Sequence, residues 1–391
     1  MNALSSDIRG TNYKVLHLLK LFRPSFTGAG IFLERLTPVM DALAPNVAHD
    51  LLVTDTPRPA ESVQSNSALR NIIYLQKGGI SNWRREFLLL WWLLRNIQQY
   101  RVIHFHTHVD RYFLSYLLAK LFRKRVILSS ALDDSVPNVI GTYRRAYRPL
   151  VRLLVRLVDL FMTISPKLYA ETAAVVGPKK VHLVPIGVAV PAYPATERNA
   201  TRAALGLTAE DIVLIFVGGI CSRKDPLFLV ERMPAVRGFC PHAKLVIVGP
   251  VLEADHQQKM LAYIRDHGLE DHVIFTGNVL DPYPLYAMAD IMVFASHLEG
   301  FGCAVTEGMA HCLPAVARHL PGVNDFFVHQ GKTGFLFRTP EDYLGALRLL
   351  IDDPVRRRQI GLAARHLILS EFDDAKAAKR ILSIYGFNQN A

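Results

Sequence analysis

Short apolar runs alternate with helix-like stretches along almost the whole chain of 391 residues, and this alternation limits the possible folds more than any single motif. Most of the runs are unbroken, as is typical of strands buried on both faces of a parallel sheet. In the first half the strand candidates are Lys14–Leu19, Asp50–Thr54, Asn71–Leu75, Val102–His106, Arg125–Ser130, Leu160–Ser165 and Val181–Pro185. In the second half they are Ile212–Val217, Lys244–Gly249, Val273–Thr276, Ile291–Ala295, Ala315–Ala317 and Gly334–Phe337. The pattern predicts an α/β protein with doubly wound parallel sheets.

The length of the chain exceeds what one hydrophobic core usually supports, so we expect two domains. A segment rich in proline and without apolar periodicity, residues 185–201, indicates a linker. We therefore expect an N-terminal domain (1–187), a linker (188–200), a C-terminal domain (201–372) and a C-terminal helix within 373–391 that packs back on the first domain. Two doubly wound domains joined in this way would face each other across a ligand-binding cleft.

The composition indicates a basic protein that stays in the cytoplasm. The net charge is +11, which suits polyanionic partners such as nucleic acid, anionic lipid or phosphorylated small molecules. Val15–Phe22 is too short for a signal peptide and contains Lys20, and the longest apolar run, Phe87–Leu94, is far below the roughly 20 residues that span a bilayer. The cysteines form no C-x-x-C pair and no zinc-type cluster, so we expect reduced thiols at Cys221, Cys240, Cys303 and Cys312.

The most informative motif is the segment 299–314, E-G-F-G-C-A-V-T-E-G-M-A-H-C-L-P. Its carboxylates Glu299 and Glu307 lie eight positions apart around a Gly-Phe-Gly turn that follows an apolar strand and opens a short helix. Such a turn leaves backbone N–H groups for phosphate or hydroxyl oxygens, and a carboxylate in the helix can accept hydrogen bonds from the diol of a ribose. The alternative is that both glutamates only stabilise a helix end.

A second motif, F-V-G-G-I-C-S-R-K-D at residues 216–225, follows the first strand of the second domain. Gly218 and Gly219 allow the backbone to turn tightly, and Arg223 and Lys224 supply cations at the start of the next helix. This combination favours a diphosphate-binding loop over a merely solvated basic turn. It is neither a G-x-G-x-x-G fingerprint nor a P-loop.

Together these motifs resemble the retaining glycosyltransferases of family four, which have the GT-B fold of two Rossmann-like domains and use nucleotide sugars. The resemblance extends through T-G-N-V, P-G-V-N-D and G-K-T-G-F-L, at 276–279, 321–325 and 331–336, and covers nearly the whole chain. It implies that Lys224 meets the donor phosphates, Glu299 contacts the transferred sugar and Glu307 binds the ribose. The family often has arginine where this chain has Gly219, so Arg223 is expected to compensate. The implied donor site comprises Gly30, Gly218, Gly219, Arg223, Lys224, Asn278, Val279, Glu299, Gly300, Phe301, Gly302, Cys303, Ala304 and Glu307.

In the first domain, V-I-H-F-H-T-H-V-D places His104 and His106 on one face of a strand, with His106 at its carboxyl end. Closely spaced histidines can bind zinc, but no cysteine or suitably spaced carboxylate joins them, so no metal is expected. A strand-end histidine can also be purely structural. The resemblance implies that His106, with His108 as the alternative, reaches the donor sugar and acts in catalysis with Lys224 and Glu299.

The acceptor side is less well specified. Asp133 and Asp134 follow a strand and, with His108, are candidates for acceptor binding, although Asp134 could simply start a helix. The two aspartates are adjacent and do not form a D-x-D metal motif. Gly28 and Gly30 are expected in a loop before a helix over Ile31–Leu43, whose Pro38 would disturb it.

The positive charge is concentrated in residues 111–156, with ten basic residues against two acidic ones. The four-residue spacing of Arg144, Arg148, Arg152 and Arg156 predicts one stripe on a helix. With the tryptophans near residues 83–92, this favours contact with an anionic membrane face over a core helix with a solvated arginine side. No nucleic-acid-binding motif accompanies the charge, so no nucleic acid partner is expected.

The sequence therefore predicts a cytoplasmic glycosyltransferase, peripheral on the inner face of the plasma membrane. It would move a sugar from a UDP- or GDP-sugar to an acceptor hydroxyl, with retention and without a metal or other cofactor. The acceptor would be a saccharide or lipid-linked saccharide of cell-surface polysaccharide or glycolipid synthesis. The alternatives are a nucleotide-sugar epimerase or a phosphorylase on the same fold, or a non-catalytic nucleotide-sugar-binding partner of another transferase.

Overall fold

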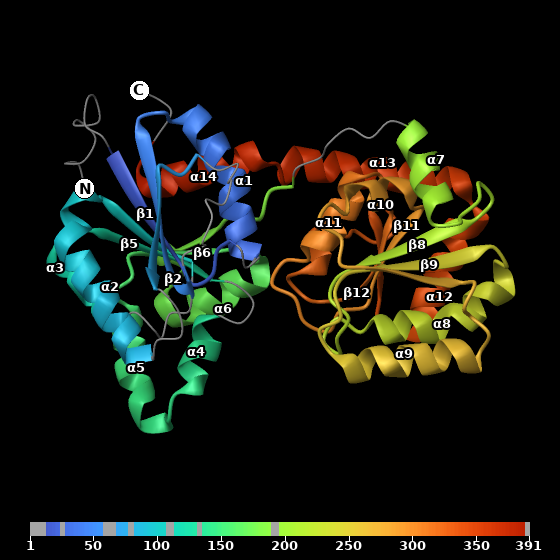
Figure 1. Ribbon diagram of the computed structural model, residues 1–391, viewed down its shortest axis with the longest axis horizontal. Helices are drawn as coiled ribbons and strands as arrows, with labels where there is room; N and C mark the ends of the chain where they lie inside the picture. Colours follow the sequence, from blue (N-terminus) through green and yellow to red (C-terminus); the bar gives the residue numbers. More distant parts are fainter. Residues whose placement is uncertain are drawn as a thin grey trace. The chain divides into compact units, whose positions relative to one another are not determined.

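The computed structural model describes residues 13–23, 28–57, 68–76, 82–106, 113–130, 135–188 and 195–387. The chain forms two compact units, one of residues 1–187 with 374–391 and one of residues 188–373 (Figure 1). Within these described ranges, no helix is long and apolar enough to cross a membrane.

The first unit is built on a seven-stranded parallel sheet with the order β3-β2-β1-β4-β5-β6-β7. Each strand candidate of the first half is a strand, because unbroken apolar runs can be buried on both faces of such a sheet. The strands are β1 (Tyr13–Leu19), β2 (Val47–Pro57), β3 (Asn71–Gln76), β4 (Val102–Phe105), β5 (Arg125–Ser130), β6 (Leu160–Thr163) and β7 (Val181–Leu183).

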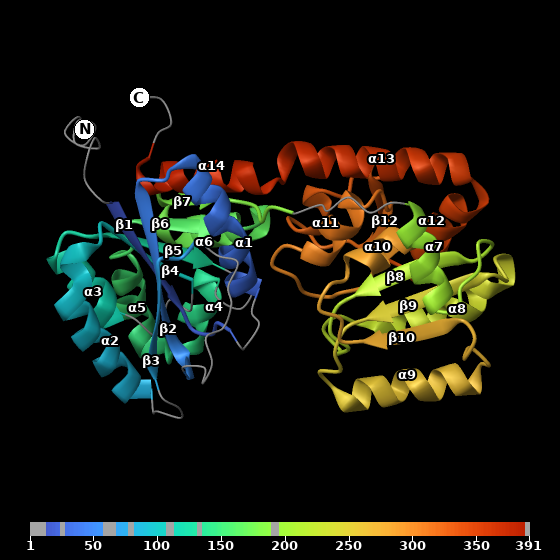
Figure 2. The same cartoon turned by 45° about the horizontal axis from the view of Figure 1, so that its top comes forward.

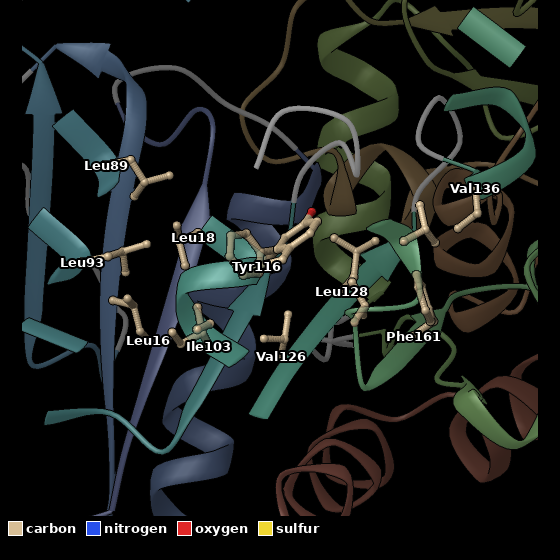
Figure 3. Close-up of a cluster of buried hydrophobic side chains, with 14 of the residues drawn as sticks. Leu16, Leu18, Leu89, Leu93, Ile103, Tyr116, Val126, Leu128, Val136 and Phe161 are labelled. Atoms are coloured by element: carbon tan, nitrogen blue, oxygen red, sulfur yellow. The ribbon is translucent and has the colours of Figure 1, made fainter. Parts of the chain in front are cut away.

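Helices cover both faces of this sheet. One face packs against α2 (Asn82–Asn96), α3 (Phe113–Leu121), α4 (Val136–Thr142), α5 (Arg148–Val155) and α6 (Pro166–Val176). Figure 3 shows this core, with Leu89 and Leu93 from α2 and Tyr116 from α3 directed at the strands. The other face packs against α1 (Gly28–Leu43) and the C-terminal helix α14 (Asp374–Tyr385). Short 3₁₀ turns are η1 (Ile97–Gln99), η4 (Arg145–Tyr147) and η5 (Pro178–Lys180).

The second unit contains a six-stranded parallel sheet with the order β10-β9-β8-β11-β12-β13. Its strands are β8 (Ile212–Val217), β9 (Ala243–Val248), β10 (Val273–Gly277), β11 (Ile291–Phe294), β12 (Ala315–Arg318) and β13 (Gly334–Phe337). One layer of helices contains α8 (Pro226–Phe239), α9 (Ala254–Asp266) and α12 (Pro340–Asp352). The other layer contains α7 (Ala195–Ala204), α10 (Tyr283–Met288), α11 (Cys303–Ala310) and α13 (Pro354–Glu371), and η6 (Asn324–Phe326) is a 3₁₀ turn (Figure 2).

Three expectations about local structure were wrong. Helix α1 begins at Gly28 and continues through Pro38, so Gly28 and Gly30 lie in its first turn rather than in a loop. The Glu34 carbonyl, which loses its usual donor because proline has no N–H, lies 3.5 Å from the Thr37 hydroxyl.

The second half of the expected linker is helix α7. Its guanidinium groups hold it on the second unit: Arg198 and Arg202 both pair with Asp290, at 2.8 and 2.6 Å. Arg202 also donates to the carbonyl oxygen of Met288. The helix is thus anchored mainly by polar contacts, which explains why apolar periodicity did not reveal it.

The arginine stripe expected over 144–156 is not one continuous helix. Arg144 has an extended backbone, and η4 and α5 follow it as separate elements. Pro149 lies in the first turn of α5, where a residue without an N–H is tolerated. In a continuous helix, Pro149 would have to donate a hydrogen bond to the carbonyl four residues earlier, and proline has no N–H to donate.

Candidate functional site

Both sheets reverse their strand order at one point. In the second unit, the chain runs outward from β8 to β9 and β10 and then returns to β11 on the other side of β8. The first unit reverses between β1 and β4 in the same way. Loops at such a reversal diverge at the carboxyl ends of the strands and leave a crevice where ligands bind in doubly wound sheets. The predicted site residues of 216–225 and 299–307 follow the two strands that meet at the reversal of the second unit.

The loop after β8 requires glycine for steric reasons. A Cβ on Gly249 would lie 2.2 Å from the carbonyl oxygen of Gly218, so the loops after β8 and β9 approach too closely for a side chain. A Cβ on Gly219 would lie 2.4 Å from the Leu252 side chain. An arginine at position 219 would therefore require Leu252 to move.

Lys224, Arg223 and Glu299 meet at the reversal point. The Glu299 carboxylate oxygen Oε1 lies 2.6 Å from Lys224 Nζ and 3.3 Å from Arg223 Nη1. It also accepts a hydrogen bond of 2.7 Å from the hydroxyl of the buried Ser296. The Lys224 ammonium lies 5.1 Å from the ring centroid of Phe294. The structure thus brings together the two cations and the carboxylate, and leaves a site of net positive charge.

Two residues that the sequence did not single out hold this cluster in place. Asp225 has a left-handed backbone (φ +50°), caps α8 through the N–H of Phe228, and accepts a hydrogen bond of 3.0 Å from Arg318. Arg318 also donates to the carbonyl of Ala295 at 2.8 Å, which ties the loop after β8 to the end of β11. The adjacency of Asp225 to Lys224 was the only available sequence signal, and Arg318 had none.

The turn before α11 is fixed by Gly302, whose φ of +91° lies in the left-handed region that favours glycine. A Cβ there would lie 3.1 Å from Asn324 Oδ1 and 3.2 Å from the Phe327 ring. The Phe301 side chain is buried against Phe327, so this stretch can meet a ligand through its backbone, with Gly300, Cys303 and Ala304, rather than through the phenylalanine ring. The amino end of α11 directs its first N–H groups and the positive end of its dipole out of the helix.

Glu307 lies one turn into α11, and the buried Tyr286 of α10 donates a hydrogen bond of 3.0 Å to its Oε2. Burial raises the pKa of Tyr286 well above its ordinary value, and the Glu307 carboxylate raises it further. The phenol therefore remains a donor at neutral pH and orients the carboxylate.

Asn278 and Val279, the residues expected to line the base, follow β10, which β9 separates from β8. Asn278 is exposed and Val279 is partly exposed.

In the first unit, His106 follows β4 at the reversal point, and its N–H donates to the carbonyl of Leu18 in β1 at 2.9 Å. Its ring belongs to a chain of imidazoles: His106 Nε2 lies 3.0 Å from His17 Nδ1, and His17 Nε2 lies 3.0 Å from His49 Nδ1. His104 bonds the Tyr385 hydroxyl of α14 at 2.6 Å and Ser129 Oγ at 2.7 Å. His17 and His49 were not recognised from the sequence, because they come from separate strands.

Burial keeps these imidazoles neutral. It lowers the pKa of His49 to about 4 and that of His106 to about 3, and it moves the pKa values of His17 and His104 well below the ordinary range. His17, His104 and His106 place one nitrogen each within 4.8 Å of one another, so these three side chains could approach a common metal ion. The chemical alternative, a neutral hydrogen-bonded chain, already satisfies His17 at both ring nitrogens.

Other first-domain candidates differ in how far they can be placed. Gly30 is buried in the first turn of α1, near the carboxyl end of β1. His108, Asp133 and Asp134 lie outside the described residues. A cavity of about 520 Å³ is lined by the first residues of β5 and β6, by β7 and by α14, with Arg125, His182, Lys379 and Arg380 among its residues, and none of the candidate residues lines it.

Comparisons with known proteins find matches to both units of the chain. Residues 197–367 match the family model described as glycosyl transferases group 1. Residues 28–187 match the model described as a glycosyl transferase 4-like domain. The chain belongs to the group 1 glycosyltransferases. Its two parallel-sheet units give it the GT-B fold, as predicted.

Named relatives of this group 1 glycosyltransferase include the D-inositol 3-phosphate glycosyltransferase of Kineococcus radiotolerans, 33% identical over 205 residues (48% of this chain and 47% of the relative). The chain thus spans about half the length of that relative. The N-acetyl-alpha-D-glucosaminyl L-malate synthase of Bacillus anthracis is 24% identical over 289 residues, which cover 73% and 74% of the two chains. Among solved structures, HepE of Anabaena in complex with UDP superposes with a TM-score of 0.78 at 18% identity, covering 95% of this chain and 99% of HepE.

Proposed function

We propose that this group 1 glycosyltransferase moves a hexose-type sugar from a nucleoside-diphosphate donor to an acceptor hydroxyl. The observation that carries the proposal is the cluster at the reversal between β8 and β11. There Lys224, Arg223 and Glu299 lie beside a glycine loop and the amino end of α11. Two cations, one carboxylate and a helix amino end suit a ligand that combines a diphosphate with sugar hydroxyls.

The chemistry begins when the bond between the sugar anomeric carbon and the diphosphate oxygen breaks, because negative charge then grows on the leaving group. An ammonium has three donors, so Lys224 can bond a phosphate oxygen while it remains 2.6 Å from Glu299. Arg223 and the amino end of α11 add to the same stabilisation. In a retaining transfer, a leaving phosphate oxygen takes the acceptor proton as the acceptor oxygen bonds the anomeric carbon on the same face. We propose that the transfer retains the anomeric configuration and needs no metal ion.

The remaining donor contacts belong to the same proposal. Glu307, oriented by Tyr286, would accept hydrogen bonds from the ribose, and Asn278 and Val279 would line the base. Glu299 is cast as a sugar binder rather than a nucleophile, since two cations already occupy one of its oxygens. HepE, which shares the fold, has been solved with UDP and with UDP-glucose. This supports UDP-sugars, with GDP-sugars as the second choice.

His106 is proposed to bind a sugar hydroxyl, and the hydrogen bond between His106 and His17 would fix its ring. The acceptor is proposed to be a saccharide or a lipid-linked saccharide of cell-surface polysaccharide or glycolipid synthesis. The enzyme would then work in the cytoplasm, peripheral on the inner face of the plasma membrane.

A thermal-shift panel of UDP, GDP, ADP and their common sugars, with and without magnesium, tests the donor site. We expect one diphosphate to raise the unfolding temperature equally with and without the metal. Glu307→Ala should abolish that shift. Glu341→Ala, which removes an exposed carboxylate from the first turn of α12, is the matched control and should keep it. No shift from a folded sample with any of these ligands would favour a non-catalytic partner of another transferase.

Product analysis separates the remaining alternatives. A nucleotide-sugar epimerase would convert the donor alone into a second nucleotide sugar. A phosphorylase would require inorganic phosphate for turnover. A transferase should do neither, and should release the nucleoside diphosphate faster when its acceptor is present.

A further inference from the structure

Three helices of the first unit, α2, α3 and α5, expose large apolar side chains on the sides that face away from the sheet. On α2 the buried residues Leu89 and Leu93 face the core, whereas Phe87, Trp91 and Leu94 lie on the opposite side of the helix. Their spacing of four and three residues keeps the exposed side chains in one stripe. Because the core-facing residues of this helix are already buried, the second apolar stripe contributes to stability only when another molecule or surface covers it.

Helices α3 and α5 repeat this arrangement. On α3 the exposed residues are Leu114, Leu117 and Leu121, and on α5 they are Leu150 and Leu153. Tyr147, just before α5, is exposed as well. The exposed fractions reach 76% at Leu121 and 65% at Phe87, so these side chains are open to solvent rather than partly sheltered.

The three stripes belong to one surface. All three helices pack on the same face of the seven-stranded sheet, since Leu93, Ala119 and Val151 contribute to one core cluster. Helices α2 and α3 are in contact, and both views place α5 beside them (Figures 1 and 2). Nine of the ten exposed large apolar residues of the first unit's described part lie on these helices or at Tyr147. An apolar surface of this kind on a folded protein usually marks an interaction site.

The charge around this apolar surface is predominantly positive, although Arg85 pairs with Asp55 and Lys120 pairs with Asp159. Within residues 82–106, 113–130 and 135–156, there are thirteen lysines and arginines and a single carboxylate, Glu86. Burial raises the pKa of Glu86, so that carboxylate is weakened as an anion. Exposed arginines on and beside the helices include Arg84, Arg95, Arg123, Arg145, Arg152 and Arg156. The guanidinium of Arg95 lies 3.4 Å from the ring centroid of Trp91, which places a cation and an indole together at the edge of the apolar stripe.

We propose that α2, α3 and α5 lie on an anionic phospholipid surface, with the leucines and Trp91 among the acyl chains and the arginines against the phosphates. Apolar stripes with cationic borders and an interfacial tryptophan are the features by which helices lie in the plane of a membrane. A second copy of this chain fits less well, because a two-fold interface would bring the same arginines against each other. The proposal deepens the proposed function by naming where a lipid-linked acceptor would be presented.

Vesicle flotation of the full chain tests the proposal without any nucleotide sugar. The wild type should float with vesicles that contain phosphatidylglycerol and remain unbound with pure phosphatidylcholine. The triple variant Phe87→Ser, Leu121→Ser and Leu153→Ser removes one exposed apolar residue from each helix and should lower the partition coefficient at least about 100-fold. The double variant Arg152→Glu and Arg156→Glu should lower it at least about 25-fold, since each cation near the surface contributes about fivefold.

The matched control carries Val355→Ser, Leu362→Ser and Leu369→Ser, which remove exposed apolar residues from α13 of the second unit, and it should float like the wild type. Cooperative thermal unfolding of every variant, and an unchanged shift with nucleoside diphosphate, would show that folding and the donor site are intact. The proposal is overturned if the wild type floats with neither vesicle or equally with both, or if the apolar triple variant floats like the wild type. It is also overturned if the wild type is a dimer that this variant dissociates, because the occupant would then be a second copy.

Discussion

Replacing Lys224 by methionine should separate the two roles that this ammonium can have, neutralising Glu299 and stabilising the leaving diphosphate. Methionine keeps much of the apolar stem and removes the charge. The Lys224 and Glu299 side chains are only 16% and 9% exposed, so this pair resembles a buried ion pair. Removing one partner of such a pair typically costs about 3–5 kcal/mol of stability. Glu299 would keep Arg223 at 3.3 Å and the Ser296 hydroxyl at 2.7 Å, so we expect a smaller loss, about 2 kcal/mol.

The loss in turnover should exceed the loss in stability. Removing one preorganised group that stabilises developing negative charge typically lowers the rate about 100- to 1,000-fold, or about 2.7–4 kcal/mol. Urea unfolding would give the first number, and the rate of nucleoside-diphosphate release from the donor would give the second. Arg223→Met is the matched control for the loss of stability. The Arg223 side chain is 38% exposed and lies farther from Glu299, so its ion pair should contribute no more than about 1 kcal/mol.

The double variant Lys224→Met with Glu299→Gln decides between the two roles. Glutamine needs no cation, so the double variant should recover part of the lost stability. If Lys224 acts on the diphosphate itself, turnover stays as low as in the single variant. Recovered turnover in the double variant, or near wild-type turnover in Lys224→Met alone, would refute the assignment of Lys224 to the leaving group.

Three further predictions concern other contacts. Tyr286→Phe removes the 3.0 Å hydrogen bond to Glu307 and should weaken diphosphate binding about fivefold in calorimetry, the value of one hydrogen bond of about 1 kcal/mol. The folded-state pKa values of His49 and His106 lie below 6.5, so the unfolded chain binds more protons than the folded chain below that pH. The free energy of unfolding should therefore be constant above pH 6.5 and fall toward pH 4 by up to about 1.4 kcal/mol per pH unit for each histidine. Urea unfolding at each pH should give a shallower slope in His49→Gln. Arg202→Met, which breaks the buried pair with Asp290, should destabilise the second unit by about 3 kcal/mol in urea unfolding, and the more exposed Arg198→Met by less.

The strands were predictable because the apolar run that identifies each strand lies within its own few residues. A run such as Ile212–Val217 is apolar throughout, and only a strand buried on both faces of a sheet explains such a run at this length. Helix α7 was missed because its anchors are guanidinium groups that bond Asp290 and the carbonyl of Met288, about ninety positions away. Periodicity detects apolar stripes, and a helix held by polar contacts over such a distance has none.

The candidate site divides in the same way. The carboxylates and cations of 299–307 and 218–224 could be proposed because their local patterns suit phosphate and ribose. Their supports could not: Ser296, Asp225 and Arg318 act only because β8, β11 and β12 end side by side. In the first unit the chain of His106, His17 and His49 joins residues from three strands that are far apart in the sequence.

The two reversals of strand order place the chemistry in both units. Each reversal puts the loop after the unit's first strand beside the loop after a strand that the chain reaches only later, β4 in one unit and β11 in the other. In the second unit the residues there are charged, and in the first the imidazole of His106 is held neutral by burial. A neutral imidazole suits hydroxyl groups, whereas a cluster of net positive charge suits phosphates. The same kind of strand reversal therefore carries two chemically different sites, one suited to hydroxyl groups and the other to phosphates.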